Sequence, residues 1–155
     1  MRLSDYLRPE YVSLGLKADS KEQLLDEMVA LAAKNPKVLD PEKVRAAIFE
    51  REKIMSTGVG KGFAIPHGKT DAVDDIILAF AVTAEPIDYA SMDNEPVRLV
   101  LLLVSRDNLV GQRLKLLSRA SKVMNNDAAR NALLQAKSVS EILDIFRAEE
   151  DKIGD

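Results

Sequence analysis

A single histidine, His67, is the side chain of this sequence best suited to covalent chemistry. A free imidazole has a pKa near ~6.5, so at neutral pH the ring is largely uncharged and nucleophilic. A ring nitrogen of this kind can take up a phosphoryl group and pass it on. Pro66 stiffens the approach to His67, and Gly68 has no side chain to obstruct a docking protein. These neighbours favour phosphoryl transfer; the plainer alternative is a histidine in an ordinary turn.

Phosphoryl transfer at a histidine makes three demands on its surroundings. The ring must be exposed, a hydrogen bond at one nitrogen must fix the tautomer, and the phosphate needs cations or N–H donors. Gly68, through its backbone N–H, and Lys69, through its ammonium group, are the candidates for holding phosphate.

Other kinds of site find little support. The absence of cysteine excludes disulfides, thiolate catalysis and zinc–thiolate sites, and one histidine excludes a histidine-rich metal site. The carboxylates of Asp71, Asp74 and Asp75 are interpreted as a solvated turn. We therefore expect neither a metal ion nor a cofactor.

Two glycine-rich segments resemble nucleotide-binding loops without matching them. In the segment 58–62 the third glycine of a dinucleotide fingerprint falls one place early. In the segment 62–70, five residues separate the glycines where a P-loop has four, and Pro66 removes an N–H from the cradle. These glycines are interpreted as permitting tight turns with positive φ.

Composition and net charge argue against several classes of protein. The 155 residues fit one domain, and the net charge of −3 argues against a nucleic-acid binder and against a polybasic membrane-surface binder. The N-terminus lacks the apolar stretch of a signal peptide, and no apolar run approaches the ~20 residues of a membrane span. A cytoplasmic protein without direct membrane insertion is expected.

Hydrophobic periodicity and capping residues predict five helices, at 21–34, 41–52, 110–124, 128–136 and 141–147. The expected N-caps are Ser20, with Gln23 completing a capping box, Asp40, Asp127, and either Ser138 or Ser140.

A short strand is expected at 12–16, and two runs rich in Ile, Val and Leu, at 76–83 and 97–104, are typical of interior strands. The order of elements predicts an α/β fold: a single domain with a small mixed β-sheet flanked by α-helices on both faces. The domain is expected to cover residues 1–150, followed by a short polar tail at 151–155.

The segment 51–69 resembles the signature of enzyme IIA domains of the fructose/mannitol type (type 2). These domains belong to the bacterial phosphoenolpyruvate:sugar phosphotransferase system and include the nitrogen-regulatory IIA proteins. The similarity extends in order over nearly the whole chain. The residues that carry it are Arg51-Glu52-(x)3-Ser56-Thr57-Gly58-Val59-Gly60-(x)-Gly62-Phe63-Ala64-Ile65-Pro66-His67-Gly68-Lys69.

The resemblance implies roles for particular residues. His67 matches the phosphorylated histidine, with the histidine-containing phosphocarrier protein as donor and a IIB domain as acceptor. Arg51 matches an arginine near that histidine, where a guanidinium would neutralise phosphoryl charge. Without the resemblance, Arg51 would be interpreted as a helix-end residue that favours the helix dipole.

The sequence departs from the family at one position. Members commonly carry a second histidine at the start of the helix after the last strand, and Arg113 stands there. One hypothesis is that Arg113 acts as a second phosphate clamp that makes the phosphorylated form more persistent. The alternative is a solvated helix residue.

Two functions using His67 are open: phosphotransfer for sugar uptake, and a regulatory switch set by phosphorylation. No permease segment or IIB-like cysteine motif is fused to the domain, which favours regulation. A third alternative is a phosphorylation-independent regulatory binding protein with the IIA fold. Phe63 and Ile65 are candidates for an apolar docking surface, or alternatively for the core.

Overall fold

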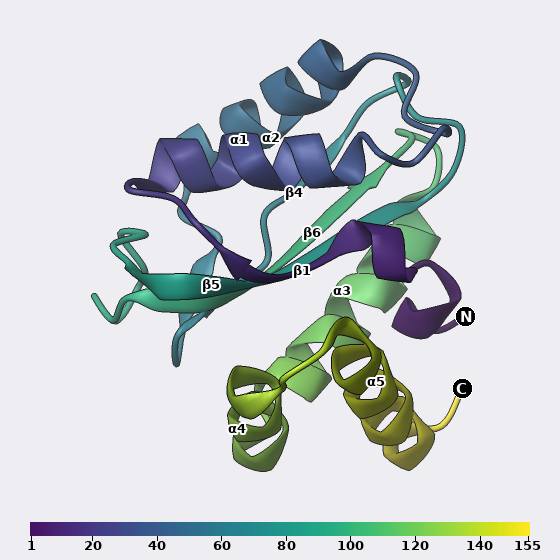
Figure 1. The fold of residues 1–155 in the computed structure, drawn as a ribbon. Helices are drawn as coiled ribbons and strands as arrows, with labels where there is room; N and C mark the ends of the chain where they lie inside the picture. The colour runs from purple at the N-terminus through teal and green to yellow at the C-terminus, as the bar shows by residue number, and fades with distance from the viewer.

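A mixed, open sheet of six strands forms the middle layer of the computed structural model, which describes residues 1–155 (Figure 1). The strand order is β1-β5-β6-β3-β2, with β4 also paired to β6. The central strands β5 and β6 are antiparallel, whereas β1 runs parallel to β5, and β3 and β4 run parallel to β6. The strands are β1 (Val12–Leu16), β2 (Gly58–Gly60), β3 (Phe63–Ala64), β4 (His67–Lys69), β5 (Ile77–Ile87) and β6 (Val97–Ser105).

Five α-helices cover the two faces of this sheet. Helices α1 and α2 lie over one face and α3, α4 and α5 over the other (Figure 1). The predicted α/β fold, with a mixed sheet flanked by helices on both faces, is confirmed. The helices are α1 (Lys21–Ala32), α2 (Pro41–Ile54), α3 (Val110–Met124), α4 (Asp127–Gln135) and α5 (Val139–Ile153), and two short 3-10 turns, η1 (Leu3–Asp5) and η2 (Pro9–Tyr11), precede β1.

The central strands β5 and β6 contribute side chains to two hydrophobic cores, one on each face of the sheet. Successive side chains of a strand point to opposite faces. In β5, Leu78 and Phe80 pack in the cluster beneath α3, α4 and α5, while Ile77 and Ala79 pack in the cluster beneath α1 and α2. Coverage of both faces explains why the sequence of these strands shows almost no polar alternation.

Several helix starts agree with the predicted caps. Ser20 and Ser138 accept N–H bonds at the starts of α1 and α5, and Asp40 does so at α2. The Gln23 side chain, however, accepts from the Asp19 N–H, so the expected reciprocal box is displaced by one residue. The prediction for α4 was wrong: Asn126 caps it, and Asp127 is its first residue.

Helix α5 is longer than predicted and runs through Ile153. Its last turns are held by Glu150, which is fully buried and accepts N–H bonds from Leu3 and Ser4. Arg119 of α3 pairs with Glu150 at 3.0 Å and also donates to the Gly154 carbonyl. The residues 151–155, expected as a polar tail, therefore carry the end of a packed helix.

The glycine-rich stretch 56–68 holds three short strands, which the sequence did not predict. Gly60 and Gly62 adopt φ of +119° and +83° as β2 turns into β3. Positive φ is the conformation for which these glycines were singled out. The turn brings the chain back beside β6 and then into β4, where His67 lies.

Candidate functional site

His67 is the first residue of β4, an outer strand that lies between β6 and α2. Its side chain is half-buried and borders two adjoining clefts. The larger cleft has a volume of 620 Å³ and runs along α2 towards the start of α3; the smaller has 220 Å³ and reaches β2. The ring is thus held by the fold on one side and open to a ligand on the other.

One nitrogen of the His67 ring is fixed by the backbone. Nδ1 lies 2.8 Å from the carbonyl oxygen of Ile65. A carbonyl only accepts hydrogen bonds, so Nδ1 carries the proton and the neutral ring presents the unprotonated Nε2. This arrangement meets the second demand of phosphoryl transfer, a fixed tautomer with a free nucleophilic nitrogen.

Burial lowers the pKa of His67 below its ordinary value of 6.5. The positive charges of Arg51 and Arg113 lower it further, while the hydrogen bond to Ile65 and the carboxylate of Glu52 act in the opposite direction. The net shift keeps the imidazole uncharged at neutral pH, the form in which its nitrogen is nucleophilic.

Two arginines from different helices face the same space as His67. Arg51, in the last turn of α2, donates to the Met55 carbonyl at 2.9 Å and borders both clefts. Arg113, in the first turns of α3, donates to the Ser105 hydroxyl at 2.9 Å and borders the larger cleft. The fold therefore brings residues 51, 67 and 113 to the border of one cleft. The resemblance predicted a place near His67 for Arg51, and it left Arg113 open between a phosphate clamp and a solvated helix residue.

The two other phosphate candidates have different surroundings. Gly68 is buried against α2, and an added Cβ would lie 3.2 Å from the backbone of Ala47. The parallel ladder, with Leu103 donating to Pro66 and Thr70 donating to Ser105, directs the N–H of Gly68 towards β6. The expectation that this N–H binds phosphate is therefore wrong, because the sheet uses it.

Lys69 remains available at the rim of the larger cleft. Its ammonium lies 3.6 Å from the carboxylate of Asp107, and both side chains are exposed. An exposed pair of this kind is weak and can open to a phosphate.

Phe63 and Ile65 are both buried in the core beneath the helices, although Ile65 also lines the smaller cleft. Other apolar side chains are exposed beside the clefts. Ile54 is 80% exposed and borders the larger cleft, and Val59 is 53% exposed and borders the smaller one. The exposed apolar surface near His67 is therefore formed by Ile54 and Val59.

A polar cluster that the sequence did not predict adjoins the site through Thr57, which lines the smaller cleft. The carboxylate of Glu52 accepts from the N–H and hydroxyl of Thr57, from the Tyr89 hydroxyl at 3.1 Å, and pairs with Lys21 at 2.9 Å. Glu52 and Thr57 both stand within the 51–69 signature, which was the available signal. Nothing in the sequence pointed to Tyr89, which lies 32 residues after Thr57 and 37 after Glu52.

The acidic residues of the segment 71–75, which follows β4, pair with basic side chains. Asp75 pairs with Lys37, and Asp71 and Asp74 lie 3.7 and 3.9 Å from Arg106. No group of three or more histidine or carboxylate side chains gathers as metal ligands would. None of the five helices is both long and apolar enough to cross a membrane.

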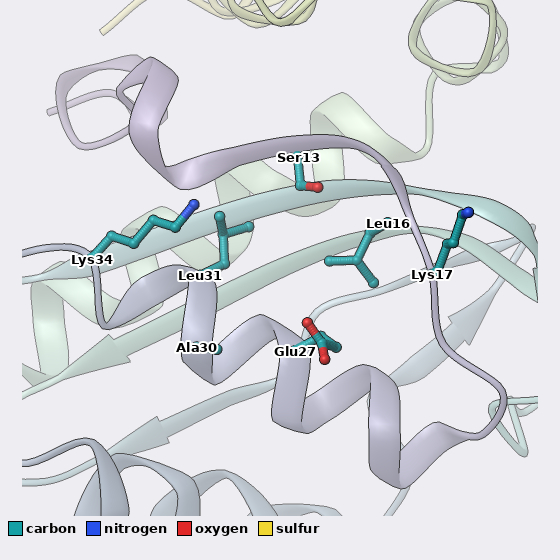
Figure 2. A pocket seen from close by; sticks show the side chains of 7 residues that line it. All are labelled: Ser13, Leu16, Lys17, Glu27, Ala30, Leu31 and Lys34. Carbon is teal, nitrogen blue, oxygen red and sulfur yellow. The ribbon is translucent and has the colours of Figure 1, made fainter.

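A further cleft, of 330 Å³, lies between β1 and α1 (Figure 2). Figure 2 shows Lys34 and Lys17 at opposite ends of it, with the carboxylate of Glu27 between them. None of its lining residues borders the clefts at His67. No histidine lines this cleft, and its two lysines, Lys17 and Lys34, share it with the carboxylate of Glu27.

Comparison with known proteins agrees with this geometry. The family model described as "Phosphoenolpyruvate-dependent sugar phosphotransferase system, EIIA 2" matches residues 5–149. The chain is 34% identical over 146 residues to the PTS system fructose-specific EIIABC component of Bacillus subtilis, covering 94% of this chain and 23% of that protein's length. It is 34% identical over 149 residues to a nitrogen regulatory protein of Bradyrhizobium diazoefficiens, covering 94% and 95% of the two chains.

Solved structures show the same likeness. Nitrogen regulatory protein IIA-Ntr from Neisseria meningitidis superposes with a TM-score of 0.88 at 30% identity, covering 93% of this chain and 98% of that one. The mannitol IIA enzyme of Escherichia coli, solved in complex with phosphorylated enzyme IIB, superposes with a TM-score of 0.78 at 25% identity, covering 92% and 97%. The matched range spans the whole site around His67, and the chain belongs to the EIIA 2 family of the phosphoenolpyruvate-dependent sugar phosphotransferase system.

Proposed function

We propose that this protein is a phosphoryl carrier that accepts a phosphoryl group on Nε2 of His67. The donor is the histidine-containing phosphocarrier protein, and the acceptor is a IIB domain. The observation that carries the proposal is the 2.8 Å contact between Nδ1 of His67 and the carbonyl of Ile65. It leaves Nε2 as the free nucleophile at a cleft bordered by two guanidinium groups.

The transfer step follows from this tautomer. The Nε2 lone pair attacks the phosphorus of the donor's phosphohistidine, a new N–P bond forms, and the donor imidazole leaves with the old bonding pair. The His67 ring becomes positively charged because Nδ1 keeps its proton. The Ile65 carbonyl stabilises that ring by accepting its N–H, and transfer onward restores the neutral imidazole.

The cations beside His67 have a role at the phosphorus. Arg51 reaches the clefts from the C-terminal end of α2, and Arg113 from the start of α3. Guanidinium groups placed where charge gathers on the transferring oxygens lower the barrier without needing to reorganise. Lys69 adds an exposed ammonium at the rim.

A partner protein would meet an apolar border around this cationic centre. Ile54 and Val59 are exposed at the two clefts. Phosphorylation adds about 1.5–2 negative charges at one point of this surface. The same surface therefore suits a protein that delivers phosphate and one that responds to it.

A nitrogen-regulatory role is the second candidate function. Its support is the likeness to nitrogen regulatory proteins along nearly their whole length, with 95% of the Bradyrhizobium protein covered. In this role the phosphorylation state of His67 sets which target protein binds. Transfer to a IIB domain and regulation share the first step and differ in the acceptor.

The test is phosphorylation in a purified system. The protein is incubated with phosphoenolpyruvate, enzyme I and the phosphocarrier protein, and its intact mass is measured. We expect one added phosphoryl group that is acid-labile and absent from the His67→Ala variant. An unchanged mass of the wild-type protein, or a phosphoryl group that persists in His67→Ala, would contradict the proposal. Adding a purified IIB domain then shows whether the group moves on.

A further inference from the structure

Glu52 lies next to Arg51 in the chain but lines neither cleft at His67, and its carboxylate contacts Lys21, Thr57 and Tyr89. Its side chain is only 6% exposed. It does not border either cleft, so it is not placed to touch a phosphate. Burying a carboxylate that binds four donor groups from three residues is costly and calls for a structural explanation.

The cluster holds the backbone and the side chain of Thr57 by hydrogen bonds. Both carboxylate oxygens of Glu52 lie 3.2 Å from the N–H of Thr57, and the Thr57 hydroxyl also bonds to the carboxylate. Tyr89, which is fully buried, contacts both side chains through its hydroxyl, at 3.1 Å from Glu52 and 2.9 Å from Thr57. The position of Thr57 is thus fixed through its backbone and its side chain together.

Thr57 in turn fixes the residue that binds His67. The carbonyl of Thr57 accepts the N–H of Ile65 at 3.0 Å. The carbonyl of that same Ile65 residue bonds Nδ1 of His67 at 2.8 Å. An unbroken series of hydrogen bonds therefore runs from Glu52 through Thr57 and Ile65 to the imidazole.

From this series we propose that Glu52 is a positioning residue, which holds His67 in its Nδ1–H tautomer by fixing Thr57 and, through it, the carbonyl of Ile65. The inference rests on the proposed function of His67 as the phosphoryl acceptor. Glu52 acts by where its oxygens lie and only secondarily by its charge. An acceptor oxygen at the position of Oε1, which accepts from the Thr57 N–H, the Thr57 hydroxyl and the Tyr89 hydroxyl, therefore matters more than the negative charge.

Two conservative substitutions separate position from charge. Glu52→Gln keeps the side-chain length and an acceptor oxygen for Thr57 but removes the charge. Glu52→Asp keeps the charge but withdraws it by one methylene, beyond reach of the Thr57 N–H. Glu42→Asp, a matched change at an exposed carboxylate near the start of α2, is the control.

The readout is the tautomer of the only histidine, measured on the unphosphorylated protein by long-range 1H–15N NMR, which gives a single imidazole signal set. Wild type, Glu42→Asp and Glu52→Gln should show the Nδ1–H form alone. Glu52→Asp should show both tautomers. Its phosphorylation by the phosphocarrier protein should slow by roughly 10- to 100-fold, the size expected for a small misplacement of a reacting group.

The outcomes are distinct. A pure Nδ1–H tautomer and a wild-type rate in folded Glu52→Asp would overturn the inference, as would mixed tautomers in Glu52→Gln with a pure form in Glu52→Asp, since charge would then be decisive. If Glu52→Asp does not fold, Thr57→Val and Thr57→Ser replace it, and equal tautomer populations in those two overturn the inference. Because the tautomer is read without any phosphoryl donor, a wild-type protein that fails to be phosphorylated contradicts the proposed function and leaves this result intact.

Discussion

Gly68 lies so close to Ala47 that a Cβ built on it would stand 3.2 Å from the Ala47 carbonyl carbon and oxygen. This approach of β4 to α2 sets how near the helix carrying Arg51 comes to the strand carrying His67. Arg51 stands one turn beyond Ala47 on the same helix. The glycine after His67 is therefore required by the packing that brings the cation to the imidazole.

The Gly68→Ala variant should accordingly lose both stability and phosphorylation rate. The new methyl group meets backbone, which yields less readily than a side chain, and overpacking of this kind costs about 1–3 kcal/mol. Urea denaturation and the initial rate of phosphorylation measure the two effects. Gly111→Ala is the control, because nothing lies within 4 Å of its added Cβ. That change should raise stability by about 0.4–1 kcal/mol and leave the rate unchanged.

The low pKa of His67 predicts how phosphorylation depends on pH. Burial and the two arginines keep the ring neutral below the ordinary pKa of 6.5. The rate of phosphoryl uptake should therefore stay level from pH 8 through about 6.5 and fall only at lower pH. Titration of the His67 ring protons by NMR gives the pKa directly, and a midpoint at or above 6.5 would refute this explanation.

The same shift makes a prediction about folding. Between the lowered pKa of folded His67 and the value of about 6.5 in the unfolded chain, the unfolded state binds more protons. His67 therefore contributes to stability above that window, and the contribution is lost as the pH falls through it. Comparing urea denaturation of wild type and His67→Gln across the window isolates the effect; parallel pH profiles would count against it.

Arg113 is expected to prolong the life of the phosphorylated protein. Its guanidinium is tethered to Ser105 at the end of β6 and borders the cleft of His67. A charge-assisted hydrogen bond to phosphate stabilises the phosphorylated form by about 1 kcal/mol or more. Arg113→His should shorten the phosphoryl lifetime at pH 8 roughly fivefold, followed as loss of the added mass over time. Equal lifetimes in the two proteins would remove the clamp hypothesis.

The pair between Arg119 and Glu150 should dominate the stability of the end of the chain. Glu150 is fully buried and also binds the N–H groups of Leu3 and Ser4. Glu150→Ala leaves Arg119 buried without its partner and should cost about 3–5 kcal/mol in urea denaturation. Asp144→Ala, which removes an exposed pair with Arg147, should cost less than about 0.5 kcal/mol. Similar losses of unfolding free energy in the two variants would show that the buried pair stabilises the protein no more than the exposed pair does.

The sequence predicted the fold class and most of the helices. The features that it did not predict depend on contacts between residues far apart in the chain. The fold class and α3, with its bounds at Val110–Met124, agree with expectation. Local signals carry these two features, since helical periodicity, capping and apolar strands depend on neighbouring residues. The place of Arg51 near His67 was expected only from the family resemblance, and the role of Arg113 was left open. Helix α5 was cut short because buried Glu150 looks like a surface residue until Arg119 and the N-terminus are brought to it.

The glycine-rich stretch shows the same limitation. Strands β3 and β4 depend on pairing with β6, over thirty residues further along the chain, and β2 depends on pairing with β3, so the residues of this stretch give no strand signal of their own. The role assigned to the Gly68 N–H failed for this reason, because the strand directs that group to β6. Glu52 escaped notice because Tyr89, one of its partners, becomes a neighbour only through folding.

The measurement that bears most directly on the central claim is the site of phosphorylation within the imidazole. Protein labelled with 15N at His67 is phosphorylated through the phosphocarrier protein, and the two ring nitrogens are compared by 15N and 31P NMR before and after. The hydrogen bond from Nδ1 to Ile65 predicts that the phosphoryl group is bonded to Nε2 while Nδ1 retains its proton. A phosphoryl group on Nδ1, or on any residue other than His67, would contradict the account.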